Sequence, residues 1–188
     1  MTSLMGMEIA ADDLRVIGKD AFFWTSIRSL YLSGDSVEIQ EGAFRYSSVH
    51  SLQIAAKNVI IAENGFKDSE KIMDMLVLPD LTKDICNFLK NGNGAKQLAF
   101  TNVSAGQFEK ILKENGGADL MEKADAVYVP FAREELSDPD LLEDSNVFYQ
   151  GEWHLVRYMM QNHAEEIYTV RDGETCPQSG MADVYSYP

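Results

Sequence analysis

The residues of this 188-residue chain that could do chemistry are three histidines, two cysteines and an acidic run over residues 133–146. The acidic run has the composition of a calcium loop. An EF-hand loop requires oxygen ligands at positions 1, 3 and 5, glycine at position 6 and glutamate at position 12. Counted from Asp138, position 5 is Leu142 and position 6 is Glu143. We therefore interpret the run as a solvated loop and predict no metal site.

The remaining candidate motifs are incomplete. Residues 91–96 read Asn-Gly-Asn-Gly-Ala-Lys. With Gly94 as the second glycine, a phosphate-binding loop needs glycine where Leu89 stands, and with Lys96 as its lysine it needs a hydroxyl residue in place of Gln97. Cys86 could form a thiol site with a distant histidine, although its apolar neighbours favour a core position. The histidines form no ligand pair; they are His50, His154 and His163. We expect no catalytic site and no cofactor.

Charge narrows the range of partners. Thirty acidic against sixteen basic residues give a net charge of −14. Such a surface repels phosphate backbones, so we expect no nucleic-acid partner, whereas a basic protein or a weakly bound cation fits the sign. The simpler interpretation, which we favour, is that the charge serves only solubility.

Targeting signals are not evident. Residues 1–8 lack a basic region followed by an apolar run, and no 18-residue apolar stretch exists, so we predict no signal peptide and no membrane span. Cys86 and Cys176 are too few for a disulfide framework. The compartment is unknown, with the cytoplasm as the default.

An internal repeat organises the first part of the chain. Phenylalanine preceded by alanine or glycine recurs with a 22-residue period, at Phe22, Phe44 and Phe66. The same step links other apolar columns, which are Ile17, Ile39 and Ile61; Leu30 and Leu52; and Leu32 and Ile54. Because several columns share one period, we predict three stacked units over residues 17–38, 39–60 and 61–81. The third unit drifts by one or two residues.

Each unit contains apolar–variable–apolar triplets. In Leu30-Tyr31-Leu32 and Leu52-Gln53-Ile54, strand alternation places the outer two residues on one face and the middle residue on the other. Val37-Glu38-Ile39 and Val59-Ile60-Ile61 repeat the pattern. Turns follow at Gly18, Gly42 and Asn64-Gly65, and stacking would align the three phenylalanines in one internal ladder. A single unit of this size cannot bury enough apolar surface alone, so stacking must stabilise it.

This stretch resembles the BspA-like leucine-rich-repeat family. The resemblance rests on residues 17–22, 39–44, 29–32 and 51–54, and covers residues 7–81. It implies a right-handed solenoid of short strands, usually on surface or secreted bacterial proteins that bind other proteins. We therefore predict an α+β fold: a short leucine-rich-repeat β-solenoid of about three repeats, capped by a mainly helical C-terminal segment.

The period is lost after Pro79-Asp80. Thr82 predicts a helix through Lys90, and residues 104–107 form a capping box before a second helix that ends at Gly116-Gly117. Residues 97–102 and 118–130 fit either a helix or a strand.

The C-terminal region is harder to assign. Val156, Met159, Met160, His163 and Ile167 fit an amphipathic helix, whereas a hairpin of 147–149 with 153–158 competes with it. We divide the chain into a solenoid (1–81), a helical cap or small domain (82–170) and a polar, mobile tail (171–188).

These observations favour a non-catalytic protein-interaction module of unknown ligand. Its expected contact residues are the outward-facing positions of the strands, namely Tyr31, Gln53, Glu38, Ile60 and Val77. A structural or self-assembling component, including a homo-oligomer, is the alternative. An active site in the C-terminal half is a third possibility.

Overall fold

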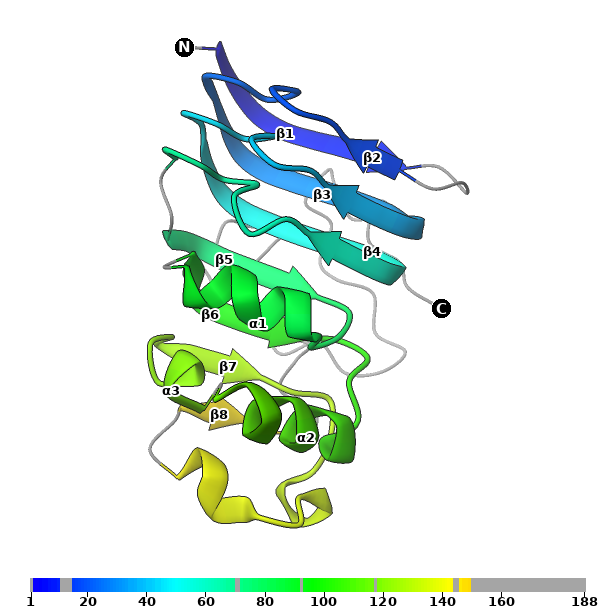
Figure 1. Cartoon of the computed structure of the whole chain (residues 1–188), viewed down its shortest axis with the longest axis vertical. Helices are drawn as coiled ribbons and strands as arrows, with labels where there is room; N and C mark the ends of the chain where they lie inside the picture. The colour runs from blue at the N-terminus through cyan, green and yellow to red at the C-terminus, as the bar shows by residue number, and fades with distance from the viewer. Residues whose placement is uncertain are drawn as a thin grey trace, which may run out of the picture.

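The computed structural model describes residues 2–10, 15–69, 72–91, 93–116, 118–143 and 146–149. One sheet of eight strands forms its frame, in the order β1-β3-β4-β5-β6-β7-β8 with β2 beside β3 (Figure 1). Every pair of neighbouring strands is parallel. The strands are β1 (Thr2–Ala10), β2 (Arg15–Ile17), β3 (Thr25–Ile39), β4 (Ser48–Ile61), β5 (Ile72–Leu78), β6 (Gly94–Phe100), β7 (Ala126–Tyr128) and β8 (Val147–Phe148). The helices are α1 (Lys83–Lys90), α2 (Ala105–Asn115) and α3 (Ala118–Met121), with 3-10 turns η1 (Arg133–Glu135) and η2 (Pro139–Leu142).

The predicted fold class is wrong. In place of a curved leucine-rich-repeat solenoid under a helical cap, the described chain forms a parallel sheet with few helices, an α/β-like arrangement. The two triplets of each unit belong to a single strand of 15 residues in β3 and 14 in β4. The physical reason is that a repeat dictates which residues lie side by side, but neither the strand length nor the curvature of the sheet.

The register expected from the repeat is confirmed. Leu30 pairs with Leu52 and Ile39 with Ile61, as the repeat period requires. Phe44 stacks on Phe22 at 4.8 Å and on Phe66 at 4.5 Å between ring centroids, with the rings within 8° of parallel. The predicted drift is also present, because Leu52 pairs with Leu76, two residues beyond the regular step. The repeat therefore sets the sheet pairing and the ladder of rings together.

The repeat does not stop at residue 80, contrary to the sequence interpretation. Leu76 pairs with Leu98 in β6 at the same 22-residue step. Phe88 follows Phe66 at this step and contacts it at 5.6 Å, although its ring is tilted by 59°. In this unit, helix α1 takes the place of the turn that packs on the sheet in the earlier units. The sequence around Phe88 therefore no longer resembles the sequence around Phe22, Phe44 and Phe66. That change hid the continuing period.

Both predicted helices are present. Thr82 caps α1, its hydroxyl accepting from the Ile85 amide, and the hydroxyl of Ser104 accepts from the Gln107 amide at the start of α2. The second half of the capping box is absent, because the Gln107 side chain donates instead to Asp80 at 2.7 Å. Gly116 ends α2 in the left-handed conformation, at φ 56°.

The ambiguous segments contain both kinds of structure. Residues 97–102 include the end of strand β6, and residues 118–130 contain helix α3 followed by strand β7. Strand β8 occupies the first part of the competing hairpin. The predicted helix around 156–167, the second hairpin strand at 153–158 and the tail at 171–188 lie outside the described residues. A domain boundary at residue 81 stays a prediction.

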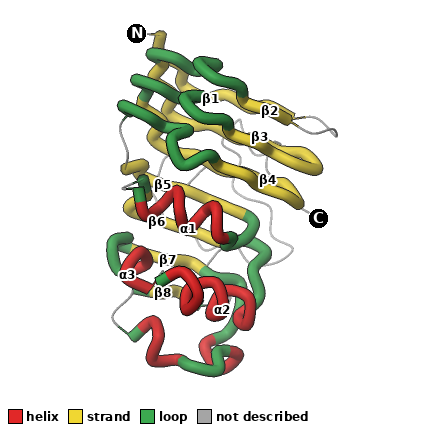
Figure 2. The backbone as a smooth tube through the Cα atoms, in the orientation of Figure 1, coloured by secondary structure: helices red, strands yellow, loops and turns green. Residues whose placement is uncertain are grey.

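The two faces of the sheet differ in what covers them. The turns between β2, β3, β4 and β5 and all three helices lie over one face, in front of the strands in Figure 2. The main core lies between these two layers and contains the phenylalanine ladder. The opposite face of the sheet is here called the second face. A separate, smaller cluster of buried residues lies on it, and this cluster comprises Met75, Val77, Ala99, Ala126 and Tyr128.

Candidate functional site

Three of the predicted contact residues lie in one line across the second face. Tyr31 pairs with Gln53, and Gln53 with Val77. The line continues through Ala99 to Tyr128, and these five residues are here called the central row. The structure thus brings Tyr31, Gln53 and Val77 together. It also buries them, with exposed fractions of 7%, 3% and 3%, so they offer no open contact strip.

The other two predicted residues form a second line near the ends of the long strands. Val16 pairs with Glu38, and Glu38 with Ile60. Val16 and Ile60 are about half exposed, and Glu38 is partly exposed. This outer row is open on the described structure, but it holds only one charged and two aliphatic side chains. Aliphatic side chains seldom dominate binding energies.

A more distinctive surface lies on the turns that lead into β3 and β4. Phe23, Trp24 and Tyr46 are 42%, 55% and 50% exposed. The Phe23 ring contacts Trp24 and Tyr46 edge to face, at 6.2 and 5.9 Å between centroids. The guanidinium of Arg45 lies 5.2 Å from the centre of the Phe23 ring and 5.6 Å from that of Tyr46. These four residues are called the aromatic patch.

The backbone beneath the aromatic patch is strained. Trp24 and Tyr46 both have a left-handed conformation, at φ 55°. This conformation costs a non-glycine residue about 1–2 kcal/mol and is reached more readily by aspartate and asparagine. The equivalent position in the next turn is Asp68, at φ 56°. Two of the three turns therefore place an aromatic residue where local energetics favour a small polar one.

Neighbouring turns hold this backbone in place. The Trp24 amide donates to the Arg45 carbonyl at 3.1 Å, and the Tyr46 amide donates to the Lys67 carbonyl at 3.3 Å. Arg45 Nε also lies 3.2 Å from the Asp20 carboxylate, which orients the guanidinium between the rings. The patch is consequently presented on a hydrogen-bonded frame rather than on an independent loop.

Sequence reasoning missed the aromatic patch, although a signal existed. Phe23 and Trp24 directly follow a ladder phenylalanine, and Arg45 and Tyr46 follow the next one, a full repeat later. In this register Trp24 aligns with Tyr46 just after the buried column. The exposed aromatic column therefore has the same 22-residue period as the buried phenylalanine column beside it.

A buried carboxylate ties helix α2 to the loop that contains η1 and η2. Glu109 is 4% exposed and accepts hydrogen bonds from Lys113 Nζ at 2.7 Å, the Ser137 hydroxyl at 2.7 Å and the Ser137 amide at 3.0 Å. Lys113 also reaches Asp138 at 3.0 Å. The hydrogen bond from Lys113, followed by those from Ser137, lowers the pKa of Glu109 to about 2. This network is fully paired, and we assign it a structural role.

The Glu109 network makes a prediction for acid stability. The folded-state pKa lies below the ordinary value near 4.5, so the contribution of Glu109 is present above that value and is lost as the pH falls towards 2. Glu109→Gln is expected to lower the urea midpoint at neutral pH. The gap between variant and wild type should narrow below about pH 4.5. A gap that stays constant down to pH 3 would contradict this assignment, and Glu114→Gln on the exposed side of α2 is the control.

A charged line crosses the sheet beside the central row. Asp74 lies 2.7 Å from Lys96 Nζ and 3.5 Å from His50 Nδ1, with all three side chains roughly half exposed. The hydrogen bond from Lys96 lowers the pKa of Asp74. The Asp74 carboxylate is thus a poor proton acceptor at neutral pH. Its ion pairs are open to solvent, and we assign them to register and solubility.

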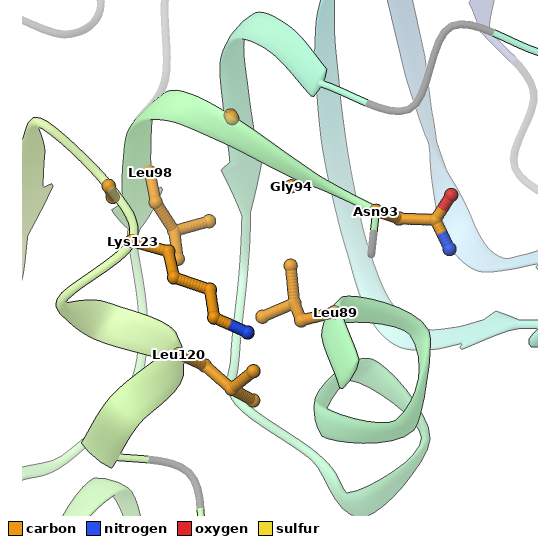
Figure 3. Close-up of a pocket in the computed structure, with 8 residues that line it drawn as sticks. Leu89, Asn93, Gly94, Leu98, Leu120 and Lys123 are labelled. Atoms are coloured by element: carbon orange, nitrogen blue, oxygen red, sulfur yellow. The ribbon is translucent and has the colours of Figure 1, made fainter. Parts of the chain in front are cut away.

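A hollow with a volume of about 70 Å³ lies between α1, β6 and α3. Figure 3 shows the Lys123 side chain extending between Leu89, Leu98 and Leu120. Lys123 is the one titratable residue of this lining, so no acid–base pair forms there. Cys86 lies in the core, and burial raises the pKa of its thiol.

The described residues contain neither a candidate metal site nor a candidate membrane-spanning helix. Within the described ranges, no group of three or more His, Cys, Asp or Glu side chains is placed to hold a metal ion. No described helix has the length and apolar character to cross a membrane. Comparison with known proteins yields no matching family model, no matching curated protein and no matching solved structure. These comparisons therefore do not identify the chain as a member of the BspA-like family.

Proposed function

We propose that this chain is a non-catalytic protein-interaction module, and that the aromatic patch is its principal contact surface. The supporting observation is the pair of exposed aromatic residues, Trp24 and Tyr46, at strained left-handed positions. Strain that persists at an exposed position motivates a functional hypothesis, because folding alone would favour the aspartate that occupies the third turn. Partner binding offers a reason to keep the aromatic side chains there.

The composition of the patch fits this proposal. Tryptophan, tyrosine and arginine dominate the energetics of protein–protein contacts. The patch combines all three with Phe23 on neighbouring turns, and their backbones are fixed before a partner arrives. A preordered surface loses little conformational entropy on binding. With a chain charge of −14, a partner with basic groups around an apolar centre is the most compatible kind.

A photo-crosslinking experiment tests the proposal. A photoreactive phenylalanine analogue at position 24 should capture discrete protein partners in extracts of the source cells, whereas the analogue at exposed Lys110 on α2 should not. Excess wild-type protein should abolish the crosslinks. Trp24→Ala combined with Tyr46→Ala should compete about 10-fold or more weakly, as expected for loss of two anchor residues. Equal competition by this double variant would rule out the patch.

Self-assembly is a second candidate, favoured by one observation. The described sheet ends on β1, a nine-residue strand with an uncharged sequence apart from Glu8. A long, flat edge strand can pair with another chain. Association through this edge would make the molecular mass in light scattering rise with concentration. A constant monomer mass over a 100-fold range of concentration would remove this candidate.

A further inference from the structure

The first repeat unit leaves the stack open at the end that carries the N-terminus (Figure 1). Strand β1 is the last strand of the described sheet on this side. Three of its side chains continue columns of the main core, yet they are only partly buried, whereas their partners in β3 are 0% exposed. The pairs are Leu4 with Ile27, Met7 with Leu30 and Ile9 with Leu32. The core is therefore accessible from this end.

The phenylalanine ladder is open at the same end. Phe22 stacks on Phe44 with one face of its ring, and no described ring lies against the other face. Phe22 is accordingly only partly buried, whereas Phe44 and Phe66 are at most 2% exposed. An aromatic face attracts a guanidinium or ammonium group. Arg45, 5.2 Å from the centre of the neighbouring Phe23 ring, already makes such a contact on these turns.

The turns hydrogen-bond to one another with a fixed polarity, in which the earlier turn donates and the later turn accepts. The first turn donates to the second from the amides of Asp20, Phe22 and Trp24, which reach the carbonyls of Gly42, Ala43 and Arg45. The second turn donates to the third in the same way. Because the backbone conformation repeats, with φ 59° at Asp20 and 71° at Gly42, the carbonyls of each turn point toward the turn before it.

The first turn has no described turn before it, so its equivalent carbonyls point out of the open end. These carbonyls belong to Asp20, Ala21 and Phe23. The Asp20 and Phe23 oxygens accept only local hydrogen bonds, from the Phe23 amide at 3.1 Å and the Thr25 hydroxyl at 3.2 Å. The Ala21 oxygen accepts none from the described residues. At this end the turn layer therefore terminates in hydrogen-bond acceptors.

The acceptors select the chemistry of an occupant. A second copy docked about a two-fold axis would set the first turn against itself, and so carbonyl oxygens against carbonyl oxygens. Lysine and arginine side chains carry hydrogen-bond donors only. The chain charge of −14 also favours a basic occupant. The open end thus fits a basic segment better than it fits a copy of itself.

We propose that the open end binds an extended, arginine-bearing segment of a partner protein. The segment adds a strand to the free edge of β1. One arginine stacks its planar guanidinium on the outer face of Phe22 and donates to the flanking carbonyls of Ala21 and Phe23. The aliphatic stems of its basic side chains cover Met7 and Ile9. This inference rests on the proposed interaction role and adds a second contact surface to it, beside the aromatic patch.

Fluorescence anisotropy with synthetic peptides tests the preference for arginine. The probe is a fluorescein-labelled peptide that alternates threonine and arginine, and its control carries lysine in place of each arginine, so both have the same charge. We expect the arginine peptide to bind about 5-fold more tightly, because only a planar guanidinium both stacks on Phe22 and donates to two carbonyls. Phe22→Leu should remove this preference. Phe148→Leu, the same substitution in β8 at the opposite edge of the sheet, should retain it.

Hydrogen exchange of the wild-type protein locates the bound peptide. The amides of residues 2–10 should exchange more slowly with the arginine peptide, whereas those of the first turn, already bonded to the second, should change little. Unprotected β1 amides, or equal affinity for the two peptides, would overturn the proposal. Protection of β1 that grows with protein concentration in the absence of peptide would identify a second copy as the occupant and also overturn it. Crosslinks from position 24 without protection of β1 would remove this inference and leave the aromatic patch standing.

Discussion

Phe44→Ala is expected to lower the free energy of unfolding by about 3–5 kcal/mol. Phe44 is fully buried and stacks on a parallel ring on each side, Phe22 and Phe66. Alanine would remove both ring contacts and leave a cavity among turns that are tied to one another by backbone hydrogen bonds, including Phe44 N–H to the Gly65 carbonyl at 2.9 Å. These bonds prevent the turns from closing over the cavity.

The free energy lost in Phe44→Ala is large compared with the stability of a typical domain. A domain is typically stable by about 5–15 kcal/mol, so the variant would lie close to unfolding at the lower end of that range. Urea titration followed by circular dichroism measures the difference. Phe23→Ala, next to the same ladder but 42% exposed, is the matched control and should cost less than about 1 kcal/mol. A comparably small loss for Phe44→Ala would contradict the stacked ladder.

A fragment of residues 1–81 is expected not to fold, although all three repeats predicted from the sequence lie within it. Strand β5 pairs with β6 over residues 72–78, and Phe66 packs on Phe88 of helix α1. The cut would expose Phe66, Met73, Leu76 and Leu78, each now at most 2% exposed. At about 1.5–3 kcal/mol per buried side chain, the loss is about 6–12 kcal/mol, comparable to the whole stability of a domain.

Thermal melts of the fragment and the full chain, recorded side by side, measure this effect. The full chain should melt in one cooperative transition, and the fragment should show none or should aggregate through the exposed edge of β5. A cooperative melt of the fragment would establish residues 1–81 as an independent domain. In that case, the pairing of β5 with β6 contributes little to the stability of the first part.

Local patterns in the sequence were sufficient for several elements. The 22-residue step determined the pairing of Leu30 with Leu52 and the stacking of the phenylalanines, because parallel strands of equal repeats place equivalent residues side by side. Thr82 and Ser104 located the starts of α1 and α2, since each hydroxyl satisfies a backbone amide within its own helical turn. All of these depend on residues that are close in sequence or related by a fixed step.

The contact surface was only partly predictable, for a definite reason. Alternation along β3 and β4 correctly placed Tyr31, Gln53 and Ile60 on the face away from the main core. It could not say which of them would be covered, because a strand pattern identifies a face and not what lies over it. Exposure of Trp24 and Tyr46 likewise depends on left-handed turns that the identity of these residues does not favour.

The sequence by itself determined which residues of this protein are neighbours: the repeat, the ladder and the helix caps. Tertiary structure alone decided that the long strands join β6, β7 and β8 in one sheet, that the central row is buried while the outer row is open, and that the aromatic patch is exposed. A period fixes the step between equivalent residues. The curvature and the extent of the sheet depend on contacts between segments that share no local pattern, such as β6 with β7, where Gln97 pairs with Ala126 outside the repeat period.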